Sequence, residues 1–346
     1  MIRSAEKLLR GRRMIAYGAG EYYDRAMKHT TVTPEYFVDD ERLGGEKCGR
    51  AIKPVSALRE ENGDAVVFIF ERNIPQAILR LSEYGCVWKQ NLFDCRCFGV
   101  NTLYYDDYVH VRDLDELGRS AVCEISIGFG AEITIENVVI PVRQNGGMVR
   151  MRFGNRSRTV IRDCVIGQGC ELNAGGNAEL VLGVGTTVGE ECMISAATDS
   201  WVRLDGRILL SHHSIVDAAN GVGIQVGDAC TFGWHLHLYA YAPLKIGGDC
   251  MCSSNVYIES GAGHDLIVDG KKRYPEPMEI GGHVWLGMGC CVLGGAGIGE
   301  DSMVGAHTVV TKKFGAAQLL AGNPARVVKE KIVWDRNYTA YKELYH

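Results

Sequence analysis

An aliphatic residue recurs at every sixth position along the stretch from Ile280 to Val310. A glycine follows most of these residues, and a small or modest residue stands four places after them. Neither an α-helix, with a period of 3.6, nor an ordinary strand, with a period of 2, produces this pattern. Three six-residue sides that close into a triangular coil do, because aliphatic side chains fill the interior and glycine adopts the corner conformations. The pattern predicts a parallel β-helix of hexapeptide repeats.

Weaker copies of the repeat begin earlier, at Ile166, Val188, Val226 and Ile246. With about 18 residues in each coil, residues 160–312 are expected to form about eight coils, after a less regular opening over 121–159. Cysteine occupies the fifth place of several repeats, where the coil needs a small side chain that points inward. We interpret these cysteines as packing residues rather than metal ligands. They are Cys170, Cys192, Cys230, Cys250 and Cys290.

Residues 13–100 have a different pattern, in which short apolar runs alternate with helical stretches. The run that begins at Met14 leads into the turn Gly18-Ala-Gly20 and then into a helix. Further strands are predicted at 36–38 and 65–70, and a helix with Ile74, Ile78 and Leu81 on one face follows the latter. This order predicts a parallel α/β domain with Rossmann-like winding.

The glycine turn raises the question of a bound nucleotide. Asp39 lies 21 positions after Gly18, close to where a dinucleotide fold places its ribose-binding acid. Tyr23 stands where the fingerprint has its third glycine, so a turn that merely joins strand to helix is the favoured interpretation. A further interpretation is that the free N–H groups of the turn bind a phosphate of a sugar nucleotide or lipid-linked donor.

Composition adds a boundary and excludes some partners. Of the 43 glycines, 10 lie in residues 1–120 and 33 in residues 121–346, which places a change of architecture near residue 120. A formal charge of −5 without clustered Lys and Arg argues against a nucleic acid partner. The start has no signal-peptide core and no stretch approaches 18 apolar residues, so we expect a cytoplasmic protein without membrane insertion. The 13 cysteines are expected to be reduced thiols.

Three stretches carry a specific family resemblance: Val284-Trp-Leu-Gly, Gly305-Ala-His-Thr-Val-Val-Thr-Lys-Lys and Ala321-Gly-Asn-Pro-Ala-Arg-Val-Val-Lys. They resemble the hexapeptide-repeat acyltransferases, and within these the bacterial O-acetyltransferases of surface polysaccharides and sialic acid. The resemblance extends over residues 224–334. It implies a left-handed coil and a homotrimer with active sites between subunits.

The resemblance also suggests how the chain is divided. Residues 1–115 are similar to the Rossmann-like domain that precedes this helix in some amino-sugar acetyltransferases. We expect a β-helix acyltransferase domain over 116–314, and a short helical tail over 315–346.

The repeat breaks after Ile258, and a polar loop intervenes before Ile280. Function often concentrates in such loops. Transfer of an acetyl group from a thioester to an alcohol needs a base, and a neutral imidazole titrates in the right range. His264 is the one histidine in the loop, and the family's matching position carries the catalytic histidine. The alternative is a loop histidine that bonds backbone, and Asp265 is a candidate to orient the ring.

The resemblance implies further site residues. The tryptophan that matches Trp285 stabilises the oxyanion through its indole N–H in the sialic acid O-acetyltransferases, although Trp285 would equally line a pantetheine groove. Acetyl-CoA, the implied co-substrate, is expected along neighbouring coils. Its amides would bond backbone at Gly287, Gly305 and Ala306. Three basic residues near the end of the helix are candidates for its phosphates, or else are solvated charges: Lys312, Lys313 and Arg326.

The remaining histidines are expected to pack or to line the acceptor pocket. They are His212, His213, His235 and His237. Zinc chemistry like that of the γ-class carbonic anhydrases has only the number of histidines in its favour, so no metal is expected.

The leading hypothesis is an acetyl-CoA-dependent O-acetyltransferase that acts on a sugar hydroxyl of a bacterial surface polysaccharide or its precursor. N-acetylation of a nucleotide-linked amino sugar and a non-enzymatic trimeric scaffold are the alternatives. A sugar-nucleotide pyrophosphorylase is excluded, because no glycine-rich nucleotidyltransferase signature opens the first domain.

Overall fold

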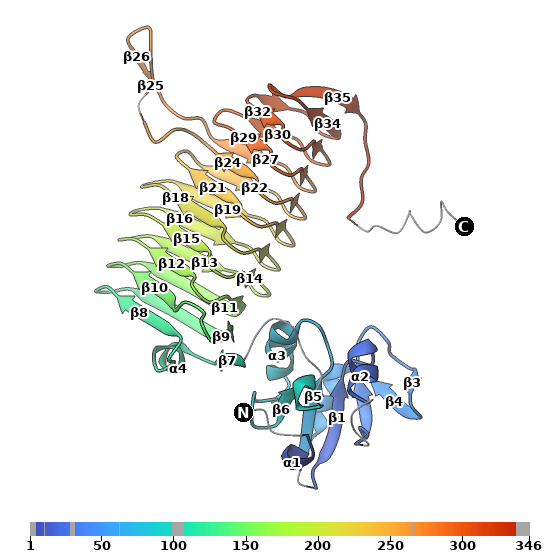
Figure 1. Ribbon diagram of the computed structural model, residues 1–346. Helices are drawn as coiled ribbons and strands as arrows, with labels where there is room; N and C mark the ends of the chain where they lie inside the picture. The colour runs from blue at the N-terminus through green and yellow to red at the C-terminus, as the bar shows by residue number, and fades with distance from the viewer. Residues whose placement is uncertain are drawn as a thin grey trace. The chain divides into compact units, whose positions relative to one another are not determined.

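The computed structural model describes residues 5–9, 11–27, 32–61, 63–98, 107–264 and 266–336. The chain divides into two compact units (Figure 1). The first contains Met1–His110 and Val139–Gln144, and the second contains Val111–Val138 and Asn145–His346. Each unit is described by itself below.

The first unit is built on a six-stranded sheet in the order β3-β4-β2-β1-β5-β6. All neighbours are parallel except the hairpin of β3 and β4. The parallel α/β sheet predicted from sequence is therefore present, and its Rossmann-like assignment stays a prediction. The strands are β1 (Arg13–Tyr17), β2 (Tyr36–Val38), β3 (Glu46–Lys47), β4 (Arg50–Lys53), β5 (Ala65–Ile69) and β6 (Leu92–Asp94).

Helices of this unit bury one face against the sheet. In α3, Ile74, Ile78 and Leu81 are all buried, as their spacing predicts. Asn73 caps this helix, since its side chain accepts a hydrogen bond from the N–H of Gln76 at 3.5 Å. The helical segments are α1 (Ala5–Leu9), α2 (Glu21–Ala26), α3 (Ile74–Ser82) and two 3₁₀ turns, η1 (Val55–Glu60) and η2 (Cys95–Phe98).

The second unit contains a parallel β-helix, as the six-residue period predicts (Figure 1). Each coil has three sides, which we call A, B and C in chain order. Side A is a nine-stranded parallel sheet of β8 (Cys123–Ile127), β10 (Val149–Phe153), β12 (Glu171–Ala174), β15 (Met193–Ala196), β18 (Ile215–Ala218), β21 (His237–Ala240), β24 (Tyr257–Glu259), β29 (Cys291–Val292) and β32 (Val309–Val310).

The other two sides continue from the two halves of β11 (Arg158–Ile166). Side B adds β13 (Glu179–Leu182), β16 (Trp201–Leu204), β19 (Gly223–Val226), β22 (Leu244–Ile246), β27 (Met278–Ile280), β30 (Gly297–Ile298) and β33 (Lys313–Phe314). Side C adds β14 (Thr187–Val188), β17 (Leu209–Leu210), β20 (Thr231–Phe232), β23 (Met251–Cys252), β28 (Trp285–Leu286), β31 (Met303–Val304) and β34 (Gln318–Ala321).

Three more elements come before β11 along the chain, namely β7 (Asp107–Val111), α4 (Leu114–Gly118) and β9 (Glu132–Val142).

The predicted coil length of 18 residues is wrong for the first coils. Glu171 pairs with Met193, and Met193 pairs with Ile215, so these coils repeat after 22 residues. Sides A and B each take eight residues here, because their strands are four residues long, and only side C keeps six. The predicted spacing appears later, where Cys291 pairs with Val309. Residues 160–312 consequently contribute seven side A strands, from β12 to β32, rather than about eight coils.

Alternate side chains of the strands point into the β-helix. In β12, β13 and β15, half-buried and buried positions accordingly alternate. The five cysteines predicted to pack at inner corners are buried, with no more than 1% of their surface exposed. Burial raises the pKa of the Cys290 thiol to about 12, which keeps it protonated at neutral pH. The packing role predicted for these cysteines is confirmed.

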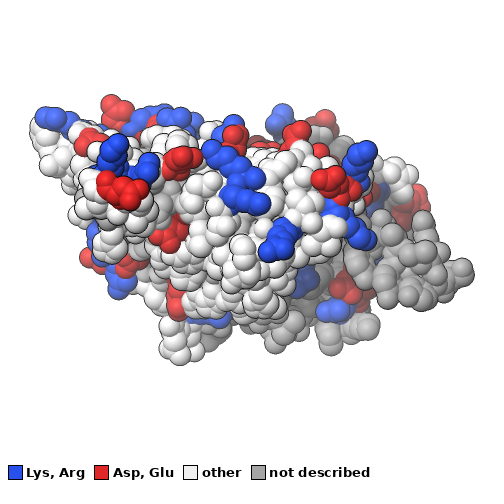
Figure 2. Space-filling view, turned by 90° about the horizontal axis from the view of Figure 1, so that it is seen from above, with Lys and Arg blue, Asp and Glu red and all other residues white. Residues whose placement is uncertain are grey.

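Charged side chains on the outside of the helix pair between neighbouring coils. Arg158 and Arg203 both bond Glu179, and Arg207 pairs with Asp228. Figure 2 shows the wider pattern, with basic and acidic side chains interspersed over the face in view. In the described part of the chain, no helix is long and apolar enough to cross a membrane.

The expected helical tail is wrong for residues 315–336. This segment forms β34 on side C and then β35 (Arg326–Glu330), which is antiparallel to it. Pro324 lies between the two strands and opposes a continuous helix, because it lacks an N–H. Val327 and Val328 are β-branched and suit a strand. Residues 337–346, the end of the predicted tail, lie outside the described residues.

Candidate active site

The loop with His264 is an insertion at the corner between sides A and B. It leaves β24 at Glu259 and returns to the stack at Met278, the first residue of β27. Its middle forms an antiparallel hairpin of β25 (Leu266–Val268) and β26 (Lys271–Arg273), which projects away from the coils in Figure 1. The stack continues past the insertion, because Tyr257 pairs with Cys291 in the next coil.

Close backbone approaches hold the first residues of this loop. The hydroxyl of Ser260, which is fully buried, donates to the carbonyl of Ala242 at 2.6 Å. A side chain on Gly261 would lie 2.7 Å from Pro275, and one on Gly263 would lie 3.3 Å from the ring of Tyr241. A side chain at Gly261 would therefore clash where the two arms of the insertion meet, and one at Gly263 would crowd the Tyr241 ring.

These contacts place His264 directly after an anchored backbone, with its own side chain exposed to solvent. Within the described part of the chain, no hydrogen bond or ion pair engages its imidazole. An exposed imidazole at the edge of the stack is accessible to a substrate. Asp265, which the sequence suggests as an orienting partner, lies outside the described residues.

A group of polar aromatic side chains faces outward on side A beside the start of the loop. The rings of His237 and Tyr257 stack on adjacent strands with centroids 6.1 Å apart, and Tyr239 lies 6.0 Å from Tyr257. The Tyr257 hydroxyl donates to Glu259 at 2.5 Å, and this bond, together with burial, raises the pKa of Tyr257. We call His237, Tyr239, Tyr257 and Glu259 the side A cluster.

Of this cluster, only His237 is a candidate from the sequence. The other three residues occupy outward positions of adjacent strands, and their grouping depends on the pairing of β21 with β24. The sequence signal was the alternation His237-Leu-Tyr239 and Tyr257-Ile-Glu259, in which a polar residue flanks each buried aliphatic one.

Trp285 lies on a different side of the coil from His264. It is the first residue of β28 on side C, and its indole N–H points to the hydroxyl of Ser253 at 3.4 Å. Its ring lies 5.9 Å from that of Trp334, a residue of the tail. The indole therefore has a weak hydrogen bond and a neighbouring aromatic ring that hold it at the surface of side C.

The tail after β35 returns along the corner between sides B and C. Trp334 stacks on His283, and its indole N–H donates to the His283 carbonyl at 3.0 Å. Arg336 donates to the carbonyl of Cys250 at 2.8 Å and to the hydroxyl of Thr231 at 3.1 Å. The sequence does not predict this contact, and its only signal there is a tryptophan and an arginine after the last strand, Trp334 and Arg336.

The expected backbone contacts for acetyl-CoA divide into two kinds. The N–H of Gly287 donates to Val304 at 2.8 Å, and the N–H of Gly305 donates to Leu320 at 2.8 Å, so both serve the stacking of coils. Ala306, in contrast, is exposed, and its N–H has no acceptor among the described residues. The Ala306 amide is therefore the one of the three that is available as a donor.

The three candidate phosphate-binding cations do not form one cluster. Arg326 is exposed on β35, and its backbone pairs with that of Ala321 in β34. The Ala321 Cβ lies 3.5 Å from where a Cβ added to Gly305 would be. Lys312 and Lys313 lie instead at the corner where the His264 loop is inserted, and Lys313 pairs with Glu276 of that loop at 3.5 Å. Arg326 thus lies at the end of side C, the side that carries Trp285. Lys312 and Lys313 lie at the corner from which the His264 loop projects.

The first unit has a pocket of about 330 Å³ at the carboxyl ends of β1, β2 and β5. Parallel sheets bind ligands at such edges. Here the N–H of Ala19 already bonds the Asp39 carboxylate at 3.2 Å, and the Glu71 carboxylate occupies the space beside Gly18. Burial and the nearby Asp39 raise the pKa of Glu71. The carboxylates of Asp39 and Glu71 beside the glycine turn disfavour binding of a dinucleotide or of any other ligand that carries a phosphate.

The other histidines flagged in the sequence lie at corners. His213 and His235 both have a φ of 58°, and their rings stack with centroids 5.1 Å apart. The ring of His212 accepts a hydrogen bond from the N–H of Glu190 at 3.1 Å. Among the described residues, no group of three or more His, Cys, Asp and Glu side chains is placed to hold a metal ion.

Comparison with known proteins defines the class of the relatives: they are acetyltransferases, although no family model matches the chain. The chain is 30% identical over 121 residues to the galactoside O-acetyltransferase of Escherichia coli K12, a match that covers 34% of this chain and 59% of the relative. It is 29% identical over 123 residues to the polysialic acid O-acetyltransferase of Escherichia coli O1:K1, covering 34% of this chain and 40% of the relative.

The chain thus spans about half the length of the curated relatives that it matches. The crystal structure of the polySia-specific acetyltransferase NeuO aligns with a TM-score of 0.44 and 19% identity, over 64% of this chain and 92% of that chain. The resemblance to hexapeptide-repeat O-acetyltransferases that the sequence predicts is confirmed for the matched third of the chain.

Proposed function

We propose that this protein is an acetyl-CoA-dependent O-acetyltransferase that acetylates a sugar hydroxyl, with His264 as general base. The observation that carries the proposal is the insertion itself, which presents an exposed imidazole five residues along the chain from Glu259 of the side A cluster. The relatives support the reaction type, since two of them are named as O-acetyltransferases of a galactoside and of polysialic acid.

The proposed reaction starts with removal of a proton from the acceptor hydroxyl by the neutral imidazole of His264. The oxygen then attacks the thioester carbonyl of acetyl-CoA, which supplies the acetyl group. The tetrahedral intermediate collapses, the C–S bond breaks, and the imidazolium returns its proton to the thiolate that leaves. In this scheme the Trp285 indole N–H, now weakly bonded to Ser253, turns to the oxyanion.

Two groups of residues on different sides of the coil support a homotrimer. His264, Lys312 and Lys313 belong to the corner between sides A and B, whereas Trp285, Ala306 and Arg326 belong to side C and its end. We propose that the first group of one subunit faces the second group of its neighbour. A left-handed coil, as in the family that the sequence resembles, is part of this proposal.

Acetyl-CoA is proposed to lie along side C, toward the corner with side A. The exposed N–H of Ala306 is a donor for an amide carbonyl of its pantetheine arm, and Arg326 provides a positive charge for its phosphates. Lys312 of the neighbouring subunit is a second charge of the same kind. Gly287 keeps the backbone of neighbouring coils close, rather than donating to the cofactor.

N-acetylation of a nucleotide-linked amino sugar is disfavoured by the first unit, because Asp39 and Glu71 occupy its glycine turn. Binding of UDP-sugars to the full chain tests this directly. Saturable binding that is lost in a Gly18→Asp variant would restore the N-acetyltransferase alternative.

Transfer of radiolabelled acetyl groups to a panel of free sugars, nucleotide sugars and oligosaccharides tests the main proposal. We expect labelled ester on a sugar that carries no amine. A second assay mixes His264→Ala and Trp285→Ala subunits, each of which is expected to be nearly inactive alone. Mixed trimers that regain activity support shared sites. Absence of acetyl-CoA binding in a thermal-shift titration would leave the trimeric scaffold as the function.

A further inference from the structure

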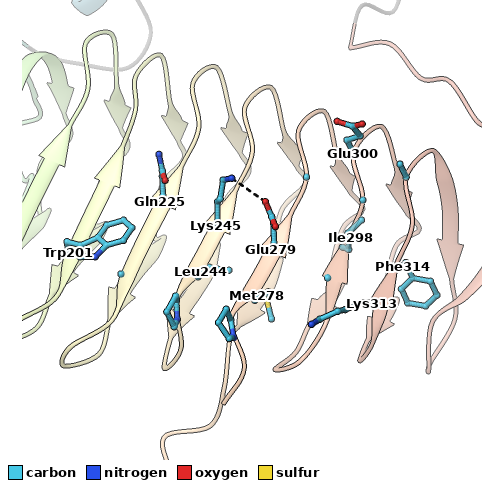
Figure 3. Close-up of a pocket in the computed structure, with 17 residues that line it drawn as sticks. Trp201, Gln225, Leu244, Lys245, Met278, Glu279, Ile298, Glu300, Lys313 and Phe314 are labelled. Atoms are coloured by element: carbon cyan, nitrogen blue, oxygen red, sulfur yellow. Dashed lines mark ion pairs between the residues drawn. The ribbon is translucent and has the colours of Figure 1, made fainter. Parts of the chain in front are cut away.

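A groove of about 760 Å³ runs along side B of the β-helix (Figure 3). Six consecutive strands of this side contribute to it, from β16 to β33. Because adjacent strands of a sheet lie about 4.8 Å apart, the groove is about 24 Å long. Figure 3 shows Trp201 near one end and Phe314 near the other. The shape suits a linear ligand that lies across the strands.

One edge of the groove is an apolar strip. Trp201 of β16 pairs with Gly223 of β19, and a Cβ on Gly223 would lie 1.9 Å from Cε2 of the indole. The absence of a side chain at Gly223 lets the indole lie flat over the neighbouring strand. Pro243 and Pro277 follow in the next two coils and line the same groove. The strip therefore presents an indole, with the Arg203 guanidinium 5.1 Å from its ring centroid, followed by two rigid proline rings.

The other edge is a polar row with balanced charge. Gln225, Lys245 and Glu279 occupy matching outward positions of β19, β22 and β27, and Lys245 pairs with Glu279 at 3.2 Å (Figure 3). At the far end, Lys313 pairs with Glu276. Positive charges along the row thus have carboxylate partners, Glu300 adds a further carboxylate to the lining, and the groove offers hydrogen-bonding groups without an excess of positive charge.

We propose that this groove binds a linear, uncharged oligosaccharide, which identifies the class of acceptor for the transferase and so rests on the proposed function. A pyranose ring has C–H groups on one face and hydroxyl groups around its edge. The C–H face stacks on Trp201 and the prolines, and the hydroxyls bond Gln225 and the Lys245–Glu279 pair. A polyanion would find no row of unpaired cations in this groove, and Glu279 would repel its negative charges.

The groove also leads toward the proposed catalytic residue. Glu276 and Pro277 belong to the arm of the insertion that returns from His264 to the stack, and Pro277 lines the groove. A saccharide on side B therefore extends to the base of the loop. The loop base lies at β27, the fourth of the six strands, so sugar units bound between Trp201 and Pro277 lead to the corner from which the His264 loop projects.

Isothermal titration of the full-length protein tests the groove without any acetyl transfer. The probes are maltohexaose, cellohexaose and xylohexaose as neutral chains, hexagalacturonate as an anionic chain, and glucose as a monomer. We expect saturable binding of at least one neutral hexasaccharide. Hexagalacturonate and glucose are expected to bind at least about tenfold more weakly.

Two variants test the platform in different ways. Trp201→Ala removes the indole, and Gly223→Ala keeps it but forces it off the neighbouring strand. Each is expected to weaken hexasaccharide binding by at least about tenfold. Trp234→Ala is the control, because this tryptophan is exposed but lies in the turn between β20 and β21, away from side B, whereas Trp201 is half-buried. Its binding is expected to equal that of the wild type.

The proposal is overturned if no neutral hexasaccharide binds at millimolar concentration, if hexagalacturonate binds more tightly, or if both groove variants bind like the wild type. Thermal unfolding of each variant shows whether it is folded, and Gln225→Ala replaces any variant that is not. Binding without acetyl transfer would refute the proposed function alone. Transfer to short acceptors with no hexasaccharide binding would refute the groove alone.

Discussion

Trp334 stacks flat on His283, with the two ring centroids 4.0 Å apart and the ring planes 3° from parallel. The first residue belongs to the tail and the second to a corner of the β-helix. Trp334 is also buried, with 8% of its surface exposed, whereas the neighbouring Val333 is 94% exposed. Trp334 is thus the one buried side chain of residues 331–336, and its ring lies 5.9 Å from that of Trp285.

Trp334→Ala is expected to release the tail while leaving the β-helix folded. The variant loses the stacked ring and the hydrogen bond to the His283 carbonyl, so local opening of residues 331–336 becomes easier. We expect limited proteolysis in this segment to be at least about tenfold faster. Val333→Ala, which changes an exposed neighbour, should be cleaved like the wild type. Equal protection of both variants would show that the stack does not hold the tail.

His264→Ala is expected to lower turnover by about 10²- to 10⁴-fold, because the acceptor hydroxyl loses its general base. The KM for acetyl-CoA should change little, since the cofactor is proposed to lie along side C. The measurement is steady-state transfer with a saccharide that the acceptor screen identifies. His235→Asn is a suitable control, because asparagine tolerates the positive φ at this corner. Turnover near the wild-type value in His264→Ala would remove this residue from the base role.

Gly287→Ala is expected to destabilise the β-helix by about 1–3 kcal/mol through overpacking. The new Cβ would lie 2.7 Å from both the Ala306 nitrogen and the Val304 oxygen, which belong to the rigid backbone of the next coil. At Gly305 the nearest atom to a new Cβ is 3.4 Å away, so Gly305→Ala should cost much less. Denaturant unfolding of the two variants measures the loss in free energy of unfolding that each substitution causes. Equal losses would contradict the role assigned to coil spacing.

Glu71→Gln is expected to stabilise the first unit at neutral pH. Burial raises the pKa of Glu71, so the folded state binds the proton more tightly than the unfolded state. The stability from this group is present below the ordinary glutamate pKa, near 4.3, and is lost as the pH rises through the raised pKa. The advantage of the glutamine variant should therefore grow between pH 4 and 7.

The gain from Glu71→Gln should stay below about 1 kcal/mol, since solvent reaches the side chain. Hydrogen exchange of β1 and β5 at several pH values reports on this unit alone. Glu60→Gln, on the exposed surface of η1, is the control. A gain that does not depend on pH would mean that charge burial at Glu71 is not its cause.

The parts of the fold that follow from local rules were predictable from the sequence. The aliphatic period from Ile280 to Val310 predicts the β-helix, and the spacing of Ile74, Ile78 and Leu81 predicts the buried face of α3. The inward position of Cys170 follows from its place in a repeat. In each case a single periodic constraint fixes which side chain points inward, so no long-range information is needed.

Other features depend on contacts between distant residues. The 22-residue coils escaped the sequence analysis, because pairs such as Glu171 with Met193 are set by strand length rather than by a six-residue count. The strand at Arg326–Glu330 forms because it pairs with β34, a contact that no local propensity reveals. The separation of Trp285 from His264 likewise depends on which side each residue occupies, and it becomes evident only when the coils are stacked.

The insertion between Glu259 and Met278 leaves the register of the coils intact, since Tyr257 still pairs with Cys291 and Leu244 with Met278 across it. Residues 261–277 therefore form an insertion whose two ends are fixed by the stack. The pairing of the coils does not depend on the length of this insertion. Exchange of the hairpin residues 266–273 within this insertion for a segment of different length or sequence would keep His264 and alter its surroundings, without redesign of the scaffold. Directed diversification of acceptor choice has a natural starting point in this segment.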